Sequence, residues 1–231
     1  MLAVLGFHKI GPPPPGGWET WNYIPEATFA GFLEVVRADG WEVIDAARFV
    51  AGLDSPSSLP ERSALLTFDD GCRSMLTVAE PILARFGLPA VAFVPTDYVG
   101  GVNSFDAGNE PEEPILTWDE IAELEKRGVS IQSHACSHAT FSALDQLHIK
   151  EELARSRSLI EEHLKTDVVL HAYPFGDAGK DAAQTAETMT ELGYRAAFLY
   201  GGVVACIPIT DRYQIPRIAV GPDTDLRAAL A

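Results

Sequence analysis

The chain alternates short runs of β-branched and apolar residues with longer amphipathic runs, and this alternation constrains its fold more than any other feature. Strands that alternate with helices form a parallel sheet, because each helix carries the chain back to the same end of the sheet. We predict strands at 3–7, 41–44, 64–68, 90–94, 129–133, 168–173, 196–200 and 214–219. We predict helices at 28–38, 73–86, 118–127, 144–164, 182–192 and 224–230. About seven or eight such strands favour a (β/α) barrel or a close relative over an open doubly wound sheet.

Several helix ends carry recognisable signals. Thr117 followed by Glu120 is the pattern of a capping box, in which Thr caps the helix and Glu reaches back to the cap amide. A glycine follows four of the predicted helical runs, where a left-handed residue is favoured. These glycines are Gly40, Gly87, Gly128 and Gly193.

Length and charge narrow the class of protein. With 231 residues the chain is long enough for one large domain, and we expect a single domain over 1–231. It has 33 acidic against 17 basic residues, a formal charge of −16. A nucleic-acid binder needs clustered Lys and Arg, and an anionic membrane surface would also repel this chain. No apolar run approaches the ~20 residues of a membrane span.

The N-terminal stretch and the cysteines bear on the compartment. Residues 1–8 lack a basic segment and their apolar run is too short for a signal peptide, so we expect a cytoplasmic protein. Three cysteines do not form a disulfide framework, which favours a reducing compartment. We interpret Cys72, Cys136 and Cys206 as small buried residues rather than ligands.

The segment 11–17 contains four consecutive prolines and cannot form a helix or a central strand. It is typical of a stiff, polyproline-like loop. Trp18 and Trp21 follow it, and we expect both on the surface.

Polar residues follow several of the predicted strands. In a (β/α) barrel the active site gathers at the carboxyl ends of the strands. Histidines and acids therefore meet at one rim, together with a Pro-Phe-Gly turn. The residues in question are His8, Asp69, Asp70, His134, His138, Pro174, Phe175 and Gly176.

The adjacent acids Asp69 and Asp70 repel each other unless a cation or a hydrogen-bond network lies nearby. A metal bound by one of them leaves the other free as a base. His134 and His138 could supply two more ligands, and three protein ligands with an open position are typical of catalytic zinc. The alternatives are a solvated Asp-Asp-Gly turn and histidines at the surface or at a helix end.

Other motifs add little. His148 and His163 fall in a polar helical run and are expected to be solvated, whereas His171 falls in a strand and is expected to be a core residue. No glycine-rich dinucleotide motif, phosphate-binding loop or serine nucleophile motif is present, which disfavours nucleotide cofactors and serine-hydrolase chemistry.

Three of these segments resemble motifs of the polysaccharide deacetylases, which carry the NodB-homology domain and form carbohydrate esterase family 4. They are Thr67-Phe-Asp-Asp-Gly71, His134-x-x-x-His138 and Tyr173-Pro-Phe-Gly176. The segments 81–83, 93–96 and 116–120 also resemble family sequence, so the similarity runs through most of the chain.

The resemblance implies a distorted (β/α) barrel and metal-dependent hydrolysis of acetyl groups from N-acetylated sugars. It implies that Asp69 is the general base and that the backbone amide of Phe175 helps to hold the oxyanion. The implied metal ligands are Asp70, His134 and His138. Zinc is the usual metal, with cobalt, nickel, manganese and iron as alternatives.

The chain departs from the common family pattern in two places. Many members have an arginine that orients the base where this chain has Ala172, and a histidine acid near the C-terminus, whereas no histidine follows His171. A circularly permuted branch, which includes poly-N-acetylglucosamine deacetylases, has its acid near the N-terminus, and Phe7-His8-Lys9-Ile10 resembles that motif. His8 is therefore the candidate acid, and Arg217 is the candidate replacement for the missing arginine.

Two other functions stay open at this point. Some relatives hydrolyse small linear or cyclic amides rather than sugars. The missing arginine and C-terminal histidine also allow an inactive glycan-binding module. We rank the deacetylase first, because both the acid pair and the histidine pair are intact. The oligomeric state is not predicted.

Overall fold

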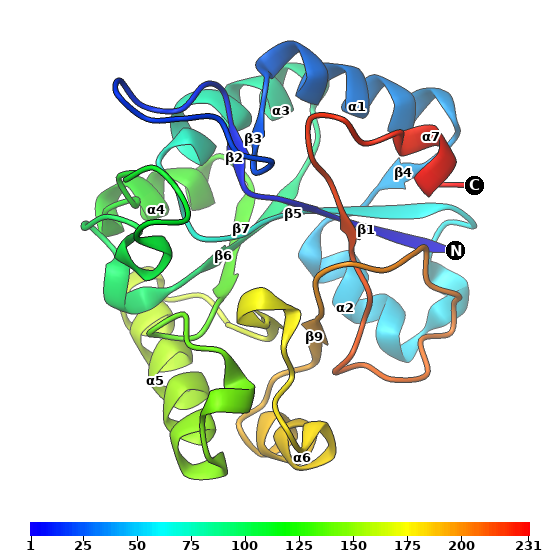
Figure 1. Ribbon diagram of the computed structural model, residues 1–231. Helices are drawn as coiled ribbons and strands as arrows, with labels where there is room; N and C mark the ends of the chain where they lie inside the picture. The colour runs from blue at the N-terminus through cyan, green and yellow to red at the C-terminus, as the bar shows by residue number, and fades with distance from the viewer.

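The computed structural model describes residues 1–231 and confirms a curled parallel sheet wrapped by helices (Figure 1). Its central strands lie in the order β10-β1-β5-β6-β7-β8-β9, and β4 pairs with the start of β5. All of these pairings are parallel. The strands are β1 Leu2–Phe7, β4 Glu42–Val43, β5 Ser63–Phe68, β6 Ala90–Val94, β7 Val129–Ser133, β8 Leu170–Ala172, β9 Ala196–Phe198 and β10 Ile218–Ala219.

The two edges of the sheet meet through the segment that precedes β10. Phe198 of β9 forms a parallel bridge with Ile215, and the amide of Leu199 donates to the Ile215 carbonyl at 2.9 Å. Three residues later the same segment pairs with β1, where Ile218 lies opposite Leu5. The result is the distorted (β/α) barrel expected from the sequence.

Seven α-helices accompany the sheet, and Figure 1 shows α1, α3, α4, α5 and α6 around its outside. The helices are α1 Glu26–Ala38, α2 Ala46–Asp54, α3 Glu80–Phe86, α4 Trp118–Lys126, α5 Gln146–Leu164, α6 Ala182–Glu191 and α7 Leu226–Ala229. The capping box of Thr117 and Glu120 is confirmed. All four predicted helix-ending glycines have positive φ, between 64° and 91°. None of the helices is long and apolar enough to cross a membrane.

Alternation along the strands divides the core into two clusters. In β1, Leu2 and Val4 belong to a cluster of 14 buried residues inside the barrel, whereas Ala3 and Leu5 belong to a cluster of 40 between the sheet and the helices. Successive strand residues point to opposite faces, so this division follows from the period of two. Phe49 of α2 joins the inner cluster.

Three elements of the structure were not predicted from the sequence. Helix α2 was not predicted, although Asp45 caps it by accepting from the Arg48 amide at 2.7 Å. The spacing of its buried residues, Ala46, Phe49 and Leu53, is the signal that could have revealed it. The two-residue strands β2 Lys9–Ile10 and β3 Tyr23–Ile24 form a separate small sheet and are too short to carry a sequence pattern.

The predicted helix 73–86 is not a continuous α-helix. A π-helical turn covers Met75–Ala79, in which the Glu80 amide donates to the Met75 carbonyl, and α3 follows it. Pro81 has no amide proton to donate and its ring clashes with a regular preceding turn, so the chain widens before it.

Several strands and one helix were predicted to be longer than they are in the structure. The strands predicted at 41–44, 168–173, 196–200 and 214–219 are shorter in the structure, and the helix predicted at 224–230 covers only α7. Some flanking residues still form single backbone hydrogen bonds to a neighbouring strand, as Leu199 does with Ile215, without forming a continuous ladder. Cys206 was predicted to be buried but is exposed, whereas Cys72 and Cys136 are buried as predicted.

Candidate active site

A cavity of about 170 Å³ lies at the carboxyl ends of β1, β5, β7 and β8. The predicted site residues converge on it, although they come from positions up to 167 residues apart. Its lining is His8, Asn22, Asp69, Asp70, Asp106, His134, His138, Phe175 and Tyr200. Arg217 does not line the cavity but lies directly beneath it, fully buried.

The three predicted metal ligands face one another. Asp70 Oδ1 lies 3.5 Å from His134 Nε2 and 3.2 Å from His138 Nε2. One ligand atom from each of the three residues falls within 4.8 Å of the others, and all three side chains are buried. A carboxylate oxygen with two imidazole nitrogens is a donor set that suits zinc and other divalent transition metals.

Hydrogen bonding orients this set for a cation. Asp70 Oδ1 is buried and has no hydrogen-bond partner. The Nδ1–H of His134 donates to the Ala172 carbonyl at 2.7 Å, so in the neutral ring Nε2 carries the lone pair that faces Asp70. Buried polar atoms normally find partners, and a cation among these three atoms would satisfy them. The residues present therefore fit a divalent metal.

The backbone around this set is held in an uncommon conformation. Five residues other than glycine have positive φ, and four of them belong to the site or flank it: Asp70, Ala135, His138 and Phe175. Such conformations cost of order 1–3 kcal/mol each and cluster at functional sites. Here they turn the chain sharply after each strand, so that the polar side chains face the cavity.

Asp69 forms a buried, bidentate ion pair with Arg217. Arg217 donates to the two carboxylate oxygens at 2.7 and 2.6 Å, and its remaining bonds go to the Leu199 carbonyl and the Thr67 hydroxyl. Burial alone would raise the pKa of Asp69, but Arg217, together with His134 and His8, outweighs it and the pKa lies below its usual value. Asp69 is therefore an oriented carboxylate at neutral pH.

Arg217 comes from the segment that closes the barrel. In the sequence it is far from Ala172, the position at which many family members have the arginine that this chain lacks. Its guanidinium lies over the rings of Phe93 and Tyr200, with distances of 5.7 and 5.3 Å to the centroids. The structure thus places an arginine on the predicted base, as the base-orienting prediction requires.

His8 lies on the rim after β1. Its Nδ1 is 3.3 Å from the Tyr200 hydroxyl, and the two rings meet edge to face. Burial lowers the pKa of His8, and Asp70 and Asp69 offset this only in part. Once protonated, this imidazole is a stronger acid than a solvent-exposed histidine.

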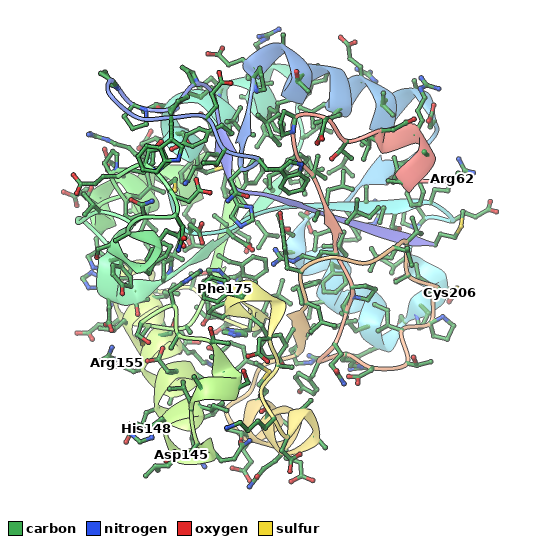
Figure 2. All side chains as sticks on the ribbon, in the orientation of Figure 1. Arg62, Asp145, His148, Arg155, Phe175 and Cys206 are labelled. Carbon is green, nitrogen blue, oxygen red and sulfur yellow. The ribbon has the colours of Figure 1, made fainter.

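The turn Pro174–Gly176 after β8 carries Phe175, which is labelled in Figure 2 and lines the cavity. The hydrogen bonds of the turn come from the amides of Gly176 and Asp177, which leaves the Phe175 amide without a backbone acceptor. The Phe175 ring is 59% exposed and meets the ring of His138 edge to face. Gly176 has a φ of 69°, and a Cβ there would lie 2.5 Å from the Tyr200 amide nitrogen.

Three lining residues were missed by the sequence analysis. Asn22 and Asp106 come from polar loops without a motif, and Tyr200 falls at the end of a predicted strand without a charged neighbour. Asp106 lines the same cavity as the candidate metal ligands. Burial raises its pKa to about 6, with a further contribution from Asp70.

The remaining histidines and tryptophans take other roles. His148 is exposed, and the exposed ring of His163 stacks on Trp118 at 4.0 Å between α5 and α4. His171 is buried as predicted; its Nδ1 bonds to the Ser133 hydroxyl, whereas its Nε2 has no partner.

Residues 57–197, more than half of the chain, match the family of polysaccharide deacetylases. The chain belongs to this family. YxkH of Bacillus subtilis, a protein named after the same family, is 23% identical over 164 residues. That match covers 71% of this chain and 55% of YxkH, so the chain spans about half the length of that relative.

A poly-β-1,6-N-acetyl-D-glucosamine N-deacetylase of Staphylococcus epidermidis is 22% identical over 239 residues, covering 95% of this chain and 79% of that protein. Among solved structures, the deacetylase PplD of Streptococcus pyogenes superimposes with a TM-score of 0.82 at 19% identity. That superposition covers 100% of this chain and 98% of PplD. At this identity the structural likeness establishes the fold.

Proposed function

We propose that this protein hydrolyses N-acetyl groups of an N-acetylated glycan in a metal-dependent reaction. One observation carries the proposal: the Asp70, His134 and His138 set shares a cavity with Asp69, a second carboxylate fixed by Arg217. A module that only binds glycans has no need of a buried, oriented base beside a set of metal-binding side chains. Membership of the polysaccharide deacetylase family supports the same reaction class.

Asp70, His134 and His138 would hold the metal, and zinc is our first choice because of its preference for nitrogen and carboxylate ligands. A divalent metal bound there supplies Lewis-acid polarisation of the acyl oxygen and a more acidic water.

The protein groups supply the rest of the chemistry. Asp69 takes a proton from the attacking water as the oxygen bonds to the acyl carbon, and the hydrogen bonds of Arg217 fix the orientation of the Asp69 carboxylate. The Phe175 amide donates to the oxygen that gains charge. His8 gives its proton to the nitrogen as the carbon–nitrogen bond breaks, so that acetate and a free amine leave.

A second cavity favours a glycan over a small amide as the substrate. It has a volume of about 310 Å³, and Trp18 lines it together with residues of the 103–112 loop, which also contributes Asp106 to the catalytic cavity. Trp18 is 51% exposed, whereas Trp21 donates to Asp223 and Trp118 stacks on His163. We propose Trp18 as the platform for a neighbouring sugar ring, since aromatic faces pack well on the apolar face of a sugar.

The test is acetate release from N-acetylglucosamine oligomers, β-1,6-linked and β-1,4-linked, by zinc-loaded enzyme beside a chelated control. Asp69→Asn should retain bound zinc but lose at least about a hundredfold in kcat, in line with removal of a general base. His134→Ala should lose zinc as well as activity. Ring opening of cyclic imides without acetate release would favour the small-amide hydrolase, and oligomer binding without any turnover would favour the inactive module.

A further inference from the structure

Asn22 lies at the catalytic cavity, and the chemistry described so far does not use it. It directly precedes β3, and its backbone carbonyl accepts from the Lys9 amide at 3.1 Å. Because His8 directly precedes Lys9, this contact places Asn22 beside the candidate acid. The two side chains therefore share the side of the cavity where the leaving nitrogen of a substrate would lie.

A partly buried hydrogen-bond network fixes the orientation of the Asn22 side-chain amide. Its Nδ2 donates to Glu110 Oε1 at 2.9 Å, while Glu110 Oε2 accepts from Lys9 Nζ at 2.8 Å and from the Thr20 hydroxyl at 2.7 Å. Lys9 is only 1% exposed, so its ammonium group keeps a carboxylate partner. A carboxylate accepts and cannot donate, and Asn22 must therefore present its nitrogen to Glu110.

The other amide atom is left for the cavity. Glu110 does not line the catalytic cavity, and no donor of the protein reaches Asn22 Oδ1. This oxygen is thus a fixed hydrogen-bond acceptor beside His8. An amide substrate carries an N–H on the nitrogen that His8 would protonate, whereas the corresponding atom of an ester is an oxygen without hydrogen.

We propose that Asn22 is a specificity-determining residue whose Oδ1 accepts the N–H of the scissile amide and so favours N-acyl over O-acyl substrates. The proposal rests on the proposed acyl hydrolysis and adds the substrate selection. An ester would leave Oδ1 facing the ester oxygen without a hydrogen bond, and a site built to bind an N–H discriminates against analogues that lack it.

The experiment compares two substrates for each enzyme, zinc-loaded throughout: an N-acetylglucosamine oligomer and 4-methylumbelliferyl acetate. Asn22→Ala removes the acceptor, and Asn22→Leu removes it while keeping the volume. Asn109→Ala is the matched control, because Asn109 is an exposed residue of the neighbouring loop outside the cavity lining. For both Asn22 variants we expect kcat/KM for the amide to fall by about tenfold or more, with ester hydrolysis within about twofold of wild type.

Equal losses on amide and ester would overturn the proposal, since Asn22 would then support the shared machinery instead of reading the N–H. Unchanged amide hydrolysis would overturn it too. A wild-type enzyme that releases acetate from neither substrate would overturn the proposed function itself, and with it the selection. If the wild type is active and the Asn22 variants lose amide and ester hydrolysis equally, only the proposed selection by Asn22 would be rejected, and the proposed function would stand.

Discussion

Arg217→Met tests whether the buried pair with Asp69 holds the site together. Arg217 is fully buried and makes four hydrogen bonds, two of them to the oxygens of Asp69. Methionine keeps much of the side-chain volume but leaves the Asp69 charge buried without a partner. Breaking one side of such a pair costs ~3–5 kcal/mol of unfolding free energy, because the remaining charge is not compensated.

The destabilisation caused by Arg217→Met should depend on pH, and the pKa of Asp69 sets the direction of that dependence. In the native protein burial acts to raise the pKa of Asp69, Arg217 together with His134 and His8 outweighs it, and the folded-state pKa lies below the ordinary 3.8. The ion pair therefore stabilises the fold above the unfolded-state pKa and is lost only as the pH falls through the lower folded-state pKa. In the variant only His134 and His8 remain to oppose burial, so the pKa of Asp69 lies higher than in the wild type, and the destabilisation should shrink as the pH falls through that raised pKa.

Urea unfolding measures the effect, with wild type and variant compared at pH 7 and at about pH 4.5. The double variant Asp69→Asn, Arg217→Met provides the control, because it removes the uncompensated charge and should recover part of the lost free energy. A loss below about 1 kcal/mol at pH 7 would refute the argument. So would a double variant less stable than Arg217→Met alone, or a deficit that grows toward low pH.

Three further predictions concern the metal, the substrate and the backbone. Burial lowers the pKa of His134 but the neighbouring aspartates raise it more. Since a metal ligand must be deprotonated, zinc affinity should fall as the pH drops through that raised pKa. Calorimetry in two buffers measures the proton uptake or release on zinc binding, and a pH-independent affinity would contradict the prediction. Trp18→Ala should lower kcat/KM for a glycan oligomer by about tenfold and leave 4-methylumbelliferyl acetate unaffected, and an equal loss on both substrates would exclude a role in sugar binding. Gly176→Ala should destabilise the fold by ~1–3 kcal/mol because a Cβ there meets the Tyr200 backbone and φ is 69°, and an unfolding curve that matches wild type would show that the turn relaxes freely.

The class of fold could be predicted from sequence because its signals are local. Alternating apolar strands and amphipathic helices dictate a parallel sheet, and the cap at Thr117 and the glycine at Gly87 set helix ends through contacts within one turn. Strand β3 was missed because it depends on a partner in another segment, since Tyr23 pairs with Lys9. Helix α2 and the widened turn before α3 did carry local signals, the Asp45 cap and Pro81, which the prediction did not use.

The candidate site also contains residues that local sequence patterns predict and residues that only tertiary contacts bring together. Asp69, Asp70 and His134 stand within two residues of a strand end, and His138 lies in the loop that follows β7, so the rule that parallel strands end at one rim brings them together without any knowledge of the fold's detail. The family resemblance supplied the roles of these residues.

Only the tertiary structure decided the remainder. It placed Arg217 on Asp69, 148 residues away in the chain, because the last segment bridges β9 and β1 and closes the barrel. It also brought Asn22 to the cavity through Glu110, in a contact between two loops that carry no motif. Strand period and strand ends are properties of a local segment, whereas these contacts arise from how distant segments pack, and no pattern within either segment encodes the other.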